Sequence, residues 1–445
     1  MVKDKIRIFF VAAALLLPAV CAFAQTSTTG TYGSFSPYSI YGIGEISRGG
    51  TAQSRSMGGV GVASRNRRFI NVANPAAVAV RDTLAFMADF GLYEDNKIYA
   101  QSGKRGAENT FNINDIVLSF PIWRSSAFLV GLSPFSDVGY SFSSKETDED
   151  KIAHVGNITY DSYGDGSLYQ LYASAGATFW KRFSVGAEFI YYFGKLDRNS
   201  NETFENSTYR SINYGTRLNL HGFTGKFGVQ YDQKLSPSVS MTLGATYRLG
   251  TKLRGYENHF AYASQSSVVD TIKSMTYTDT LAGASNAPRI ADELGVGISF
   301  RGGDRWSAEF NYLRSDWRGS NFESRKGFAA TGKANFSSTV SQSFRAGFEI
   351  VPNRNDIRYY MKRVAYRGGL YYDQDYFLMN GNRVDSYGVT FGVTLPVFRW
   401  YNGISLGVDI GRRGSSKGMM VSETYFKFVV GFNIHDVWFQ KPRCN

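Results

Sequence analysis

Residues that commonly carry catalysis or bind metals are few and scattered along the 445-residue chain. The four histidines lack the spacing of metal ligands, and Cys21 and Cys444 form no thiolate cluster. The runs Gly42-Ile43-Gly44 and Gly59-Val60-Gly61 lack the third glycine of a dinucleotide-binding loop, and no Gly-x-Ser-x-Gly elbow occurs. The sequence therefore predicts neither an enzyme nor a resident metal or cofactor.

The composition points to a different class of protein. Hydrophobic residues make up 43% of the chain and aromatic residues 16%, against 19% charged residues and a formal charge of +12. The apolar content excludes a disordered chain. After the first two dozen residues no run of about 18 apolar residues occurs, which excludes a bundle of membrane helices. A large all-β protein is the class that remains.

Residues 1–24 have the layout of a secretory signal peptide. Three basic residues precede an apolar stretch, residues 8–20, and Ala22-Phe23-Ala24 offers a cleavage site before Gln25. Cleavage removes Cys21, so Cys444 is left without a partner in the same chain. We expect an exported protein that is stabilised by hydrogen-bonded ladders and packing instead of disulfides.

From about Thr83 onward, segments of about ten residues alternate apolar and polar side chains, which is the period of a β-strand. The clearest segment lies near the C-terminus, where one face carries Phe426, Phe428, Val430, Phe432 and Ile434. The opposite faces of these segments carry glycine, serine, threonine and charge. A membrane barrel turns such an aromatic face to lipid.

Fourteen such segments occur, an even number, as bacterial single-chain barrels require. They start near Thr83, Thr110, Ala127, Ser167, Ser184, Thr216, Ser238, Pro288, Arg305, Thr339, Arg363, Val384, Gly403 and Ser422. Connections after even-numbered segments are mostly short and those after odd-numbered segments are often long, which predicts periplasmic turns and outer loops. Residues 83–445 are thus predicted to form a transmembrane antiparallel β-barrel of fourteen strands.

The same alternation turns charged side chains into the lumen. Six of them are Glu188, Arg248, Glu309, Arg345, Glu349 and Arg367. Mixed signs in a confined interior indicate paired ladders or contacts to a plug, and not a selectivity ring of one sign. An open ion-selective porin is disfavoured.

Residues 25–82 are rich in glycine and arginine and predict compact irregular structure with a short helix near residues 75–80. Asn74 suits a helix cap, and Pro75 suits the first helical position because no amide donor is needed there. The run Arg55–Ala63, followed by Asn71–Ala76 directly before the first strand, resembles the N-terminal hatch of the FadL family of long-chain fatty-acid transporters. The chain end, residues 436–441, is also similar to endings of FadL-like barrels.

The resemblance implies a fourteen-stranded barrel whose lumen is plugged by a hatch, residues 25–82. The end of such a hatch carries an Asn-Pro-Ala motif, which is matched here by Asn74, Pro75 and Ala76. An ordinary helix cap explains the same triplet. The functional interpretation adds that the cap anchors the plug to the barrel wall.

The third strand segment contains Gly131, Pro134 and Gly139. Proline cannot donate to a ladder, so Pro134 marks either a bulge within the strand or its end at the outer rim. In FadL-like proteins the third strand kinks inward and leaves a side opening into the bilayer. The resemblance implies that residues 131–139 form the equivalent kink.

The predicted outer loop at residues 251–287 is unusually apolar for a loop. An exposed apolar patch often marks a ligand site, although packing of the loop on itself explains it equally well. The candidate capture residues are Tyr256, Phe260, Tyr262, Ile272 and Met275.

Three functional hypotheses follow for a protein in the outer membrane of a Gram-negative bacterium. The first is a passive channel for small hydrophobic molecules, with capture by outer loops, gating by the hatch and lateral release at the third strand. The second is a FadL-like accessory barrel that binds partners of a type IX secretion system, and the third is a structural barrel without transport. Expected partners are outer-membrane lipid, a hydrophobic ligand and, through the C-terminal strand, the barrel-assembly machinery; nucleic acid is not expected, and a monomer is.

Overall fold

The structure is a computed structural model that describes residues 33–81, 85–123, 125–206, 208–265, 268–281, 283–328, 334–397, 402–415 and 420–437. The predicted signal peptide, residues 1–24, lies outside the described residues. Trp400 and Trp438 lie outside them as well.

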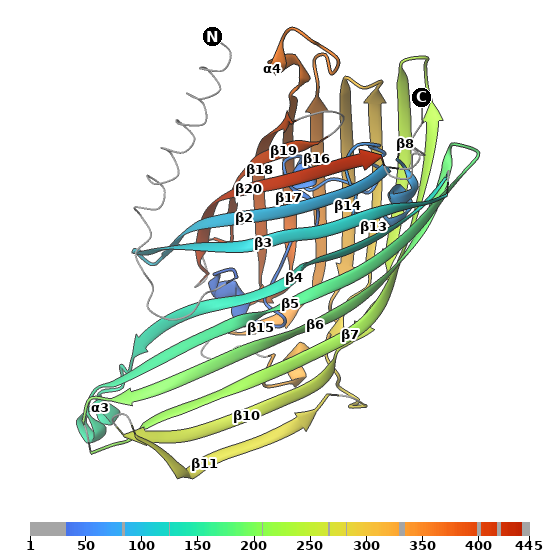
Figure 1. Ribbon diagram of the computed structural model, residues 1–445. Helices are drawn as coiled ribbons and strands as arrows, with labels where there is room; N and C mark the ends of the chain where they lie inside the picture. The colour runs from blue at the N-terminus through green and yellow to red at the C-terminus, as the bar shows by residue number, and fades with distance from the viewer. Residues whose placement is uncertain are drawn as a thin grey trace.

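Fourteen antiparallel strands follow one another around a barrel, which closes where the last strand pairs with the first (Figure 1). They are β2 (Ala85–Gln101), β3 (Lys104–Trp123), β4 (Ser126–Lys145), β5 (Ile158–Phe179), β6 (Phe183–Phe204), β7 (Ser211–Lys234), β8 (Val239–Arg248), β13 (Glu293–Gly302), β14 (Trp306–Asp316), β16 (Val340–Ile350), β17 (Ala365–Met379), β18 (Asn382–Pro396), β19 (Gly403–Arg413) and β20 (Ser422–Val437). The predicted class of fold and the number of strands are confirmed.

Shorter elements decorate this barrel. The further strands are β1 (Glu45–Ile46), β9 (Thr251–Lys252), β10 (Arg254–Gln265), β11 (Val268–Thr280), β12 (Arg289–Ile290) and β15 (Phe336–Ser338). The helices are η1 (Pro37–Ile40), α2 (Ala52–Arg55), η2 (Pro75–Ala79), α3 (Glu149–Val155), η3 (Phe322–Ser324) and α4 (Tyr360–Arg363). Within the described ranges, no helix is both long and apolar enough to cross a bilayer.

Strands on one side of the barrel are much longer than a bilayer requires. β4, β5, β6 and β7 have 20 to 24 residues, whereas about 9–11 residues suffice to cross a bilayer. Their far ends continue, with β10 and β11, as one curved sheet beyond the rest of the barrel (Figure 1). Residues 197–215, which precede the strand expected to start near Thr216, are therefore largely strand. Beyond the lipid both faces of a strand tolerate polar residues, so the alternation that marks a membrane strand fades there.

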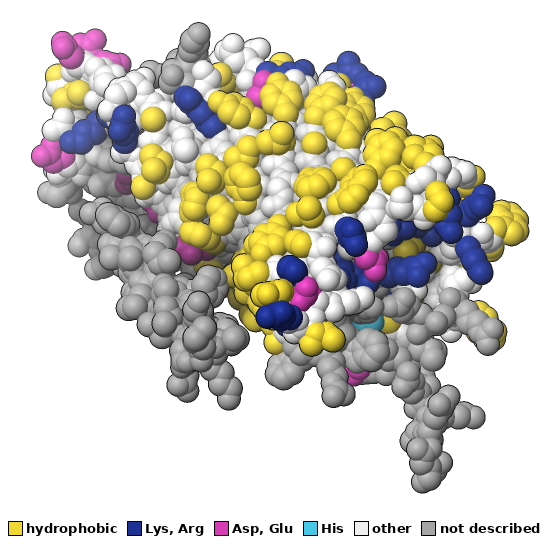
Figure 2. Space-filling view, turned by 90° about the horizontal axis from the view of Figure 1, so that it is seen from above, with side chains coloured by type: hydrophobic (Ala, Val, Ile, Leu, Met, Phe, Trp, Pro, Cys, Tyr) yellow, Lys and Arg dark blue, Asp and Glu magenta, His cyan; other side chains and the backbone are white. Residues whose placement is uncertain are grey.

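The side chains of the wall alternate between lipid and lumen. Phe189 and Phe223 are exposed on the outside, while their neighbours Glu188 and Thr224 are buried inside. Figure 2 shows apolar side chains gathered over one face of the molecule, with groups of lysine and arginine among them. Trp123 and Trp180 are largely exposed beside the turns at the short-connection end, where tryptophan favours the membrane interface.

Residues 33–81 lie inside the barrel, packed against its inner face (Figure 1). The helix η2 contacts β4, β5, β6 and β7, while α2 contacts β18, β19 and β20 on another sector of the wall. A core of buried aromatic residues joins this N-terminal segment to Trp317, Phe322, Phe328 and Phe336, which lie between β14 and β16 in the chain. The interior is therefore filled by the chain's own N-terminal part.

Candidate functional site

The strands β3 and β4 pair along only part of their length. Their register runs from Trp123↔Ser126 at the turn to Ile116↔Leu132. Beyond that point β3 stays beside β2 and β4 stays beside β5, so the two strands diverge (Figure 1). We call the two edges that do not pair with each other, residues 104–115 of β3 and 133–145 of β4, the seam.

A bulge lies where the seam begins. The register between β4 and β5 shifts between Pro134 and Ser136, because Pro134 has no amide hydrogen for a ladder. The strand continues beyond this bulge to Lys145. Pro134 therefore lies inside a strand and not at its end. The structure places Gly131 within the β3–β4 pairing and Gly139 beyond it.

Residues 33–39, which we call the seam segment, lie between the diverging strands. On one side, the Asn112 side-chain amide on β3 donates a 3.1 Å hydrogen bond to the Gly33 carbonyl oxygen. On the other side, the Ser36 amide donates a 2.7 Å hydrogen bond to the Gly139 carbonyl oxygen on β4. The seam segment thus connects two strand edges that are not hydrogen-bonded to each other.

Two residues of β2 fasten the seam segment from the same side as Asn112. The Tyr99 hydroxyl and the Lys97 ammonium donate hydrogen bonds of 2.7 and 2.9 Å to the Phe35 carbonyl oxygen. Lys97 also forms a buried ion pair of 2.7 Å with Glu45. These contacts tie the N-terminal segment to the wall beside the seam.

The short strand β1 adds a second attachment to β4. Glu45 and Ile46 pair antiparallel with Asp137 and Ser136, just beyond the bulge. At Gly44, before β1, φ is +92° and an added Cβ would lie 2.3 Å from the Asp137 carbonyl oxygen. Only glycine fits this close approach of two backbones.

The predicted Asn-Pro-Ala triplet lies at η2, deep in the barrel. The Asn74 side-chain oxygen accepts a 3.0 Å hydrogen bond from the Ala76 amide, as a helix cap does. Its amide donates to the Val62 carbonyl oxygen at 2.7 Å and to that of Val229 on β7 at 3.3 Å. Asn74 thus both caps the helix and joins the N-terminal segment to the wall.

The six predicted lumenal charges fall into two groups. Some contact the wall or the N-terminal segment: Arg367 pairs with Glu349 at 2.8 Å, and Glu309 accepts a 2.9 Å hydrogen bond from the Ala63 amide. Arg345 donates to the Gly59 carbonyl oxygen at 3.2 Å. Glu188 and Arg248 line a cavity, which Arg345 lines as well.

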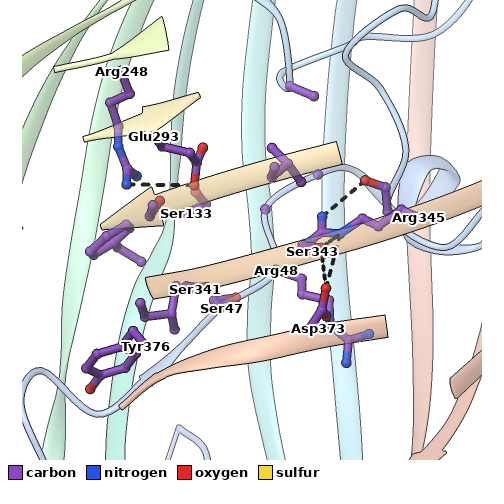
Figure 3. Close-up of a pocket in the computed structure, with 18 of the residues that line it drawn as sticks. Ser47, Arg48, Ser133, Arg248, Glu293, Ser341, Ser343, Arg345, Asp373 and Tyr376 are labelled. Carbon is purple, nitrogen blue, oxygen red and sulfur yellow. Dashed lines mark hydrogen bonds and ion pairs between the residues drawn. The ribbon is translucent and has the colours of Figure 1, made fainter. Parts of the chain in front are cut away.

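The cavity has a volume of about 260 Å³ and lies between the N-terminal segment and the wall. Figure 3 shows Arg48 directed at Asp373, and Arg248 directed at Glu293, with serine hydroxyls between them. The distances are 3.0 Å for the first pair and 3.8 Å for the second. A hydrophobic molecule in this cavity would displace water from these charged groups and offer them no hydrogen bonds in return. The cavity therefore does not suit an uncharged hydrophobic ligand.

Sequence reasoning missed Arg48. It pairs with Asp409 as well as Asp373, both at 3.0 Å, and its guanidinium lies 3.6 Å from the centre of the Tyr371 ring. Its partners come from β17 and β19, more than 300 residues away along the chain. No local pattern marks such a residue, because the contact exists only once the segment is inside the barrel.

An apolar cluster covers the outer side of this cavity. The Tyr41 ring stacks on Phe336 at 5.3 Å, and Trp317 packs on Tyr376 at 4.9 Å. The cluster reaches the seam segment through Tyr38, which packs at 6.2 Å on Phe377. The Trp317 side chain is fully enclosed in this cluster. The high proportion of aromatic residues in 35–41 and 317–336 is the signal by which the sequence could have predicted this cluster.

The candidate capture residues lie on a hairpin, not on an irregular loop. Tyr256, Phe260 and Tyr262 share one face of β10, while Met275 is opposite Ala261 and so belongs to the other face. Ile272 lies in β11, and its side chain is outside the described part of the structure. The structure therefore does not bring the five side chains together in one patch.

A closed antiparallel barrel of fourteen strands is the fold of FadL-type transmembrane proteins. The sequence matches the family model described as BamG over residues 1–445, so the chain belongs to the BamG family. Among curated proteins none matches it.

Several solved structures share this fold at low sequence identity. The toluene transporter TodX of P. putida has a TM-score of 0.61 at 15% identity, covering 88% of this chain and 100% of that one. The toluene transporter TbuX of Ralstonia pickettii has a TM-score of 0.58 at 17% identity, covering 87% and 98%. A FadL homologue of Pseudomonas aeruginosa has a TM-score of 0.56 at 11% identity, covering 89% and 100%. Identities this low establish a common fold.

Proposed function

We propose that this protein is a passive outer-membrane channel for small hydrophobic molecules, which leave the barrel sideways through the seam. The observation that carries the proposal is the end of β3–β4 pairing at Ile116↔Leu132, next to the bulge at Pro134. Two of the solved structures that share the fold are described as toluene transporters, which supports the same class of ligand here.

The apolar cluster and the seam define the route. A hydrophobic molecule would pass from the aromatic side chains around Tyr41 to those around Tyr38 and Phe35, and then between β3 and β4. Phe35 packs edge-on against Tyr99 at 5.6 Å, so aromatic contact continues to the wall itself. This path avoids the charged cavity that Arg48 and Asp373 line.

The N-terminal segment acts as the hatch in this proposal, and the parts that must move are the seam segment and the adjoining β1, both of which are attached to β4. Unpaired backbone groups facing hydrocarbon cost several kcal/mol each, so an empty seam would be unfavourable in the bilayer. In the resting state the Ser36 amide and the pairing of β1 satisfy part of the exposed backbone edge of β4, while the Asn112 side chain holds the segment on the β3 side. Opening then requires a ligand that stabilises the displaced state, which makes the seam a gate and not a leak.

The direct test is uptake by the purified full-length barrel in liposomes. Toluene and a radiolabelled long-chain fatty acid serve as probes, and native mass spectrometry shows what the purified barrel retains. The proposal expects saturable entry of at least one probe, faster than in liposomes without protein. Uptake that equals the protein-free control for both probes would overturn it.

An accessory barrel that binds protein partners is the second candidate. The curved sheet formed by the far ends of β4–β7 with β10 and β11 favours it, because bilayer crossing does not require this surface. Deleting residues 255–280 would then abolish copurification of a partner protein and leave liposome uptake unchanged. If the first proposal holds alone, no stoichiometric partner copurifies with the intact chain.

A further inference from the structure

We propose that the β10–β11 hairpin holds a divalent transition-metal ion of the zinc class at Glu257, His259 and Asp279. Donor atoms of the three side chains all lie within 4.8 Å of one another. This distance is compatible with a shared ion once the side chains close on it, since zinc–ligand distances are about 2.0–2.2 Å.

Strand pairing brings the three residues together. Glu257 and His259 are two positions apart on β10 and so share one face, and Asp279 on β11 is directly opposite Glu257. Two carboxylates in directly opposite positions repel each other and destabilise a hairpin. A cation bound between them would attract both carboxylates, so the net electrostatic energy would become favourable.

Glu257 has an unused acceptor. Its side chain is 1% exposed, and its Oε1 accepts a 2.7 Å hydrogen bond from the Gly327 amide. Its Oε2 has no hydrogen-bond partner among the described residues, although an Arg325 nitrogen lies 3.7 Å away. Arg325 thus offsets one carboxylate, and within the described ranges no lysine or arginine pairs with the second, Asp279. A buried carboxylate with a free oxygen is costly unless an ion or a donor meets it.

His259 is oriented as a metal ligand would be. Its Nδ1 lies 3.1 Å from the Thr216 hydroxyl oxygen, so a proton on Nδ1 leaves the lone pair of Nε2 free. Nε2 lies 3.1 Å from Glu257 Oε1, on the side of the two carboxylates. The ring is also stacked on Tyr277 at 4.4 Å, which restrains its rotation.

The donor set selects the class of ion. One imidazole nitrogen and two carboxylates suit Zn²⁺, and three protein ligands leave a fourth position for water. Ca²⁺ needs about six to eight oxygen ligands, which two carboxylates do not provide. A bound ion would fix the hairpin to residues 325–328, whose Phe328 carbonyl oxygen accepts a 2.9 Å hydrogen bond from Gly42 of the N-terminal segment.

The test is calorimetric titration of Zn²⁺ into the full-length barrel after treatment with a chelator. The proposal expects one Zn²⁺ per chain and no comparable heat from Ca²⁺. Asp279→Asn should weaken binding more than tenfold. Thr216→Val removes the partner of Nδ1 and should weaken it by about 10–100-fold, as for other supporting groups around a metal. Glu149→Gln removes a carboxylate elsewhere on the outer side and should change nothing.

A protonated His259 that pairs with Glu257 is the competing explanation of the cluster. In that case the unmodified chain binds no stoichiometric Zn²⁺, or Asp279→Asn and Glu149→Gln bind it alike, and either result overturns the proposal. Mobility of unheated and heated protein in detergent gels verifies that each variant still forms the barrel. Liposome uptake does not enter this test, so its outcome is independent of the proposed channel.

Discussion

The Ser36 amide donates a 2.7 Å hydrogen bond to the Gly139 carbonyl oxygen, on the strand edge that β3 has left. The backbones approach so closely here that an added Cβ on Gly139 would lie 1.7 Å from the Ser34 carbonyl oxygen. A glycine at this position therefore lets the seam segment lie directly on β4. This contact is the point at which the proposed gate should be most easily disturbed.

Gly139→Ala should loosen the seam segment and raise hydrophobic uptake severalfold. The new methyl group cannot share space with Ser34, and the Ser34 oxygen belongs to the backbone and cannot rotate away. Uptake into liposomes measures the effect. Gly106→Ala on β3 is the matched control, because a Cβ there meets nothing within 4 Å. Equal uptake by both variants would contradict the assigned role of the seam segment.

Pro134→Val should lower uptake severalfold without lowering the amount of folded barrel. Valine restores an amide hydrogen opposite Tyr169 on β5, so the bulge is no longer enforced and β4 can lie closer to β3. Adding Gly131→Val would make the test less informative. Its Cβ would lie 2.4 Å from the buried Tyr172 ring and would strain the wall. Unchanged uptake in Pro134→Val would remove the bulge from the mechanism.

Asn74→Ala should destabilise the attachment of the N-terminal segment by about 2–4 kcal/mol. Loss of a helix cap costs about 1 kcal/mol, and the carbonyl oxygens of Val62 and Val229 lose a buried donor at about 1–3 kcal/mol. Protease accessibility of residues 33–81 in the folded barrel reports this loss. Asn382→Ala, at an exposed turn, should leave the accessibility unchanged.

The Glu349–Arg367 pair should show strong coupling in a double-mutant cycle. Arg367→Met leaves Glu349 buried without its 2.8 Å partner and should cost about 3–5 kcal/mol. Adding Glu349→Met removes the unpaired buried carboxylate and should restore much of the lost unfolding free energy. Thermal unfolding in detergent measures both variants. Strictly additive losses would show that the two side chains act independently.

The alternation of apolar and polar side chains predicted most of the strands of the barrel wall. The expected starts at Gly403 and Ser422 coincide with those of β19 and β20, where one face is aromatic and the other polar. The expected start at Ser167 lies well inside β5, which begins at Ile158, because the outer part of that strand has no lipid to face. The sequence thus revealed those parts of the strands that have lipid on one face and the lumen on the other.

Contacts that depend on closure of the barrel left no trace in the sequence. Asn74 was identifiable because a cap is a local interaction with Ala76. Arg48 and Asp373 meet only through packing of the N-terminal segment on the barrel wall. Glu257 and Asp279 meet only through the register of the β10–β11 hairpin. The seam was anticipated through Pro134, but the segment that fills it was not. Nothing in the composition of residues 33–39 specifies that β3 and β4 are its neighbours.

The most direct test of the gate is a disulfide between the N-terminal segment and β4. Ile46 and Ser136 are paired residues of β1 and β4, and side chains of such pairs have Cβ atoms about 4.5–5.5 Å apart, near enough for a bond after small adjustment. The background is Cys444→Ser, which leaves no other thiol once the predicted leader is removed.

The measurement is uptake of a hydrophobic probe by the Ile46→Cys/Ser136→Cys barrel in liposomes, before and after reduction. Each single-cysteine variant serves as a control for the substitution itself. The account predicts that the oxidised barrel is blocked and that reduction restores uptake to the level of the single-cysteine variants. Equal uptake in the oxidised and reduced states, with the disulfide verified by mass spectrometry, would contradict lateral release through a seam that the N-terminal segment gates.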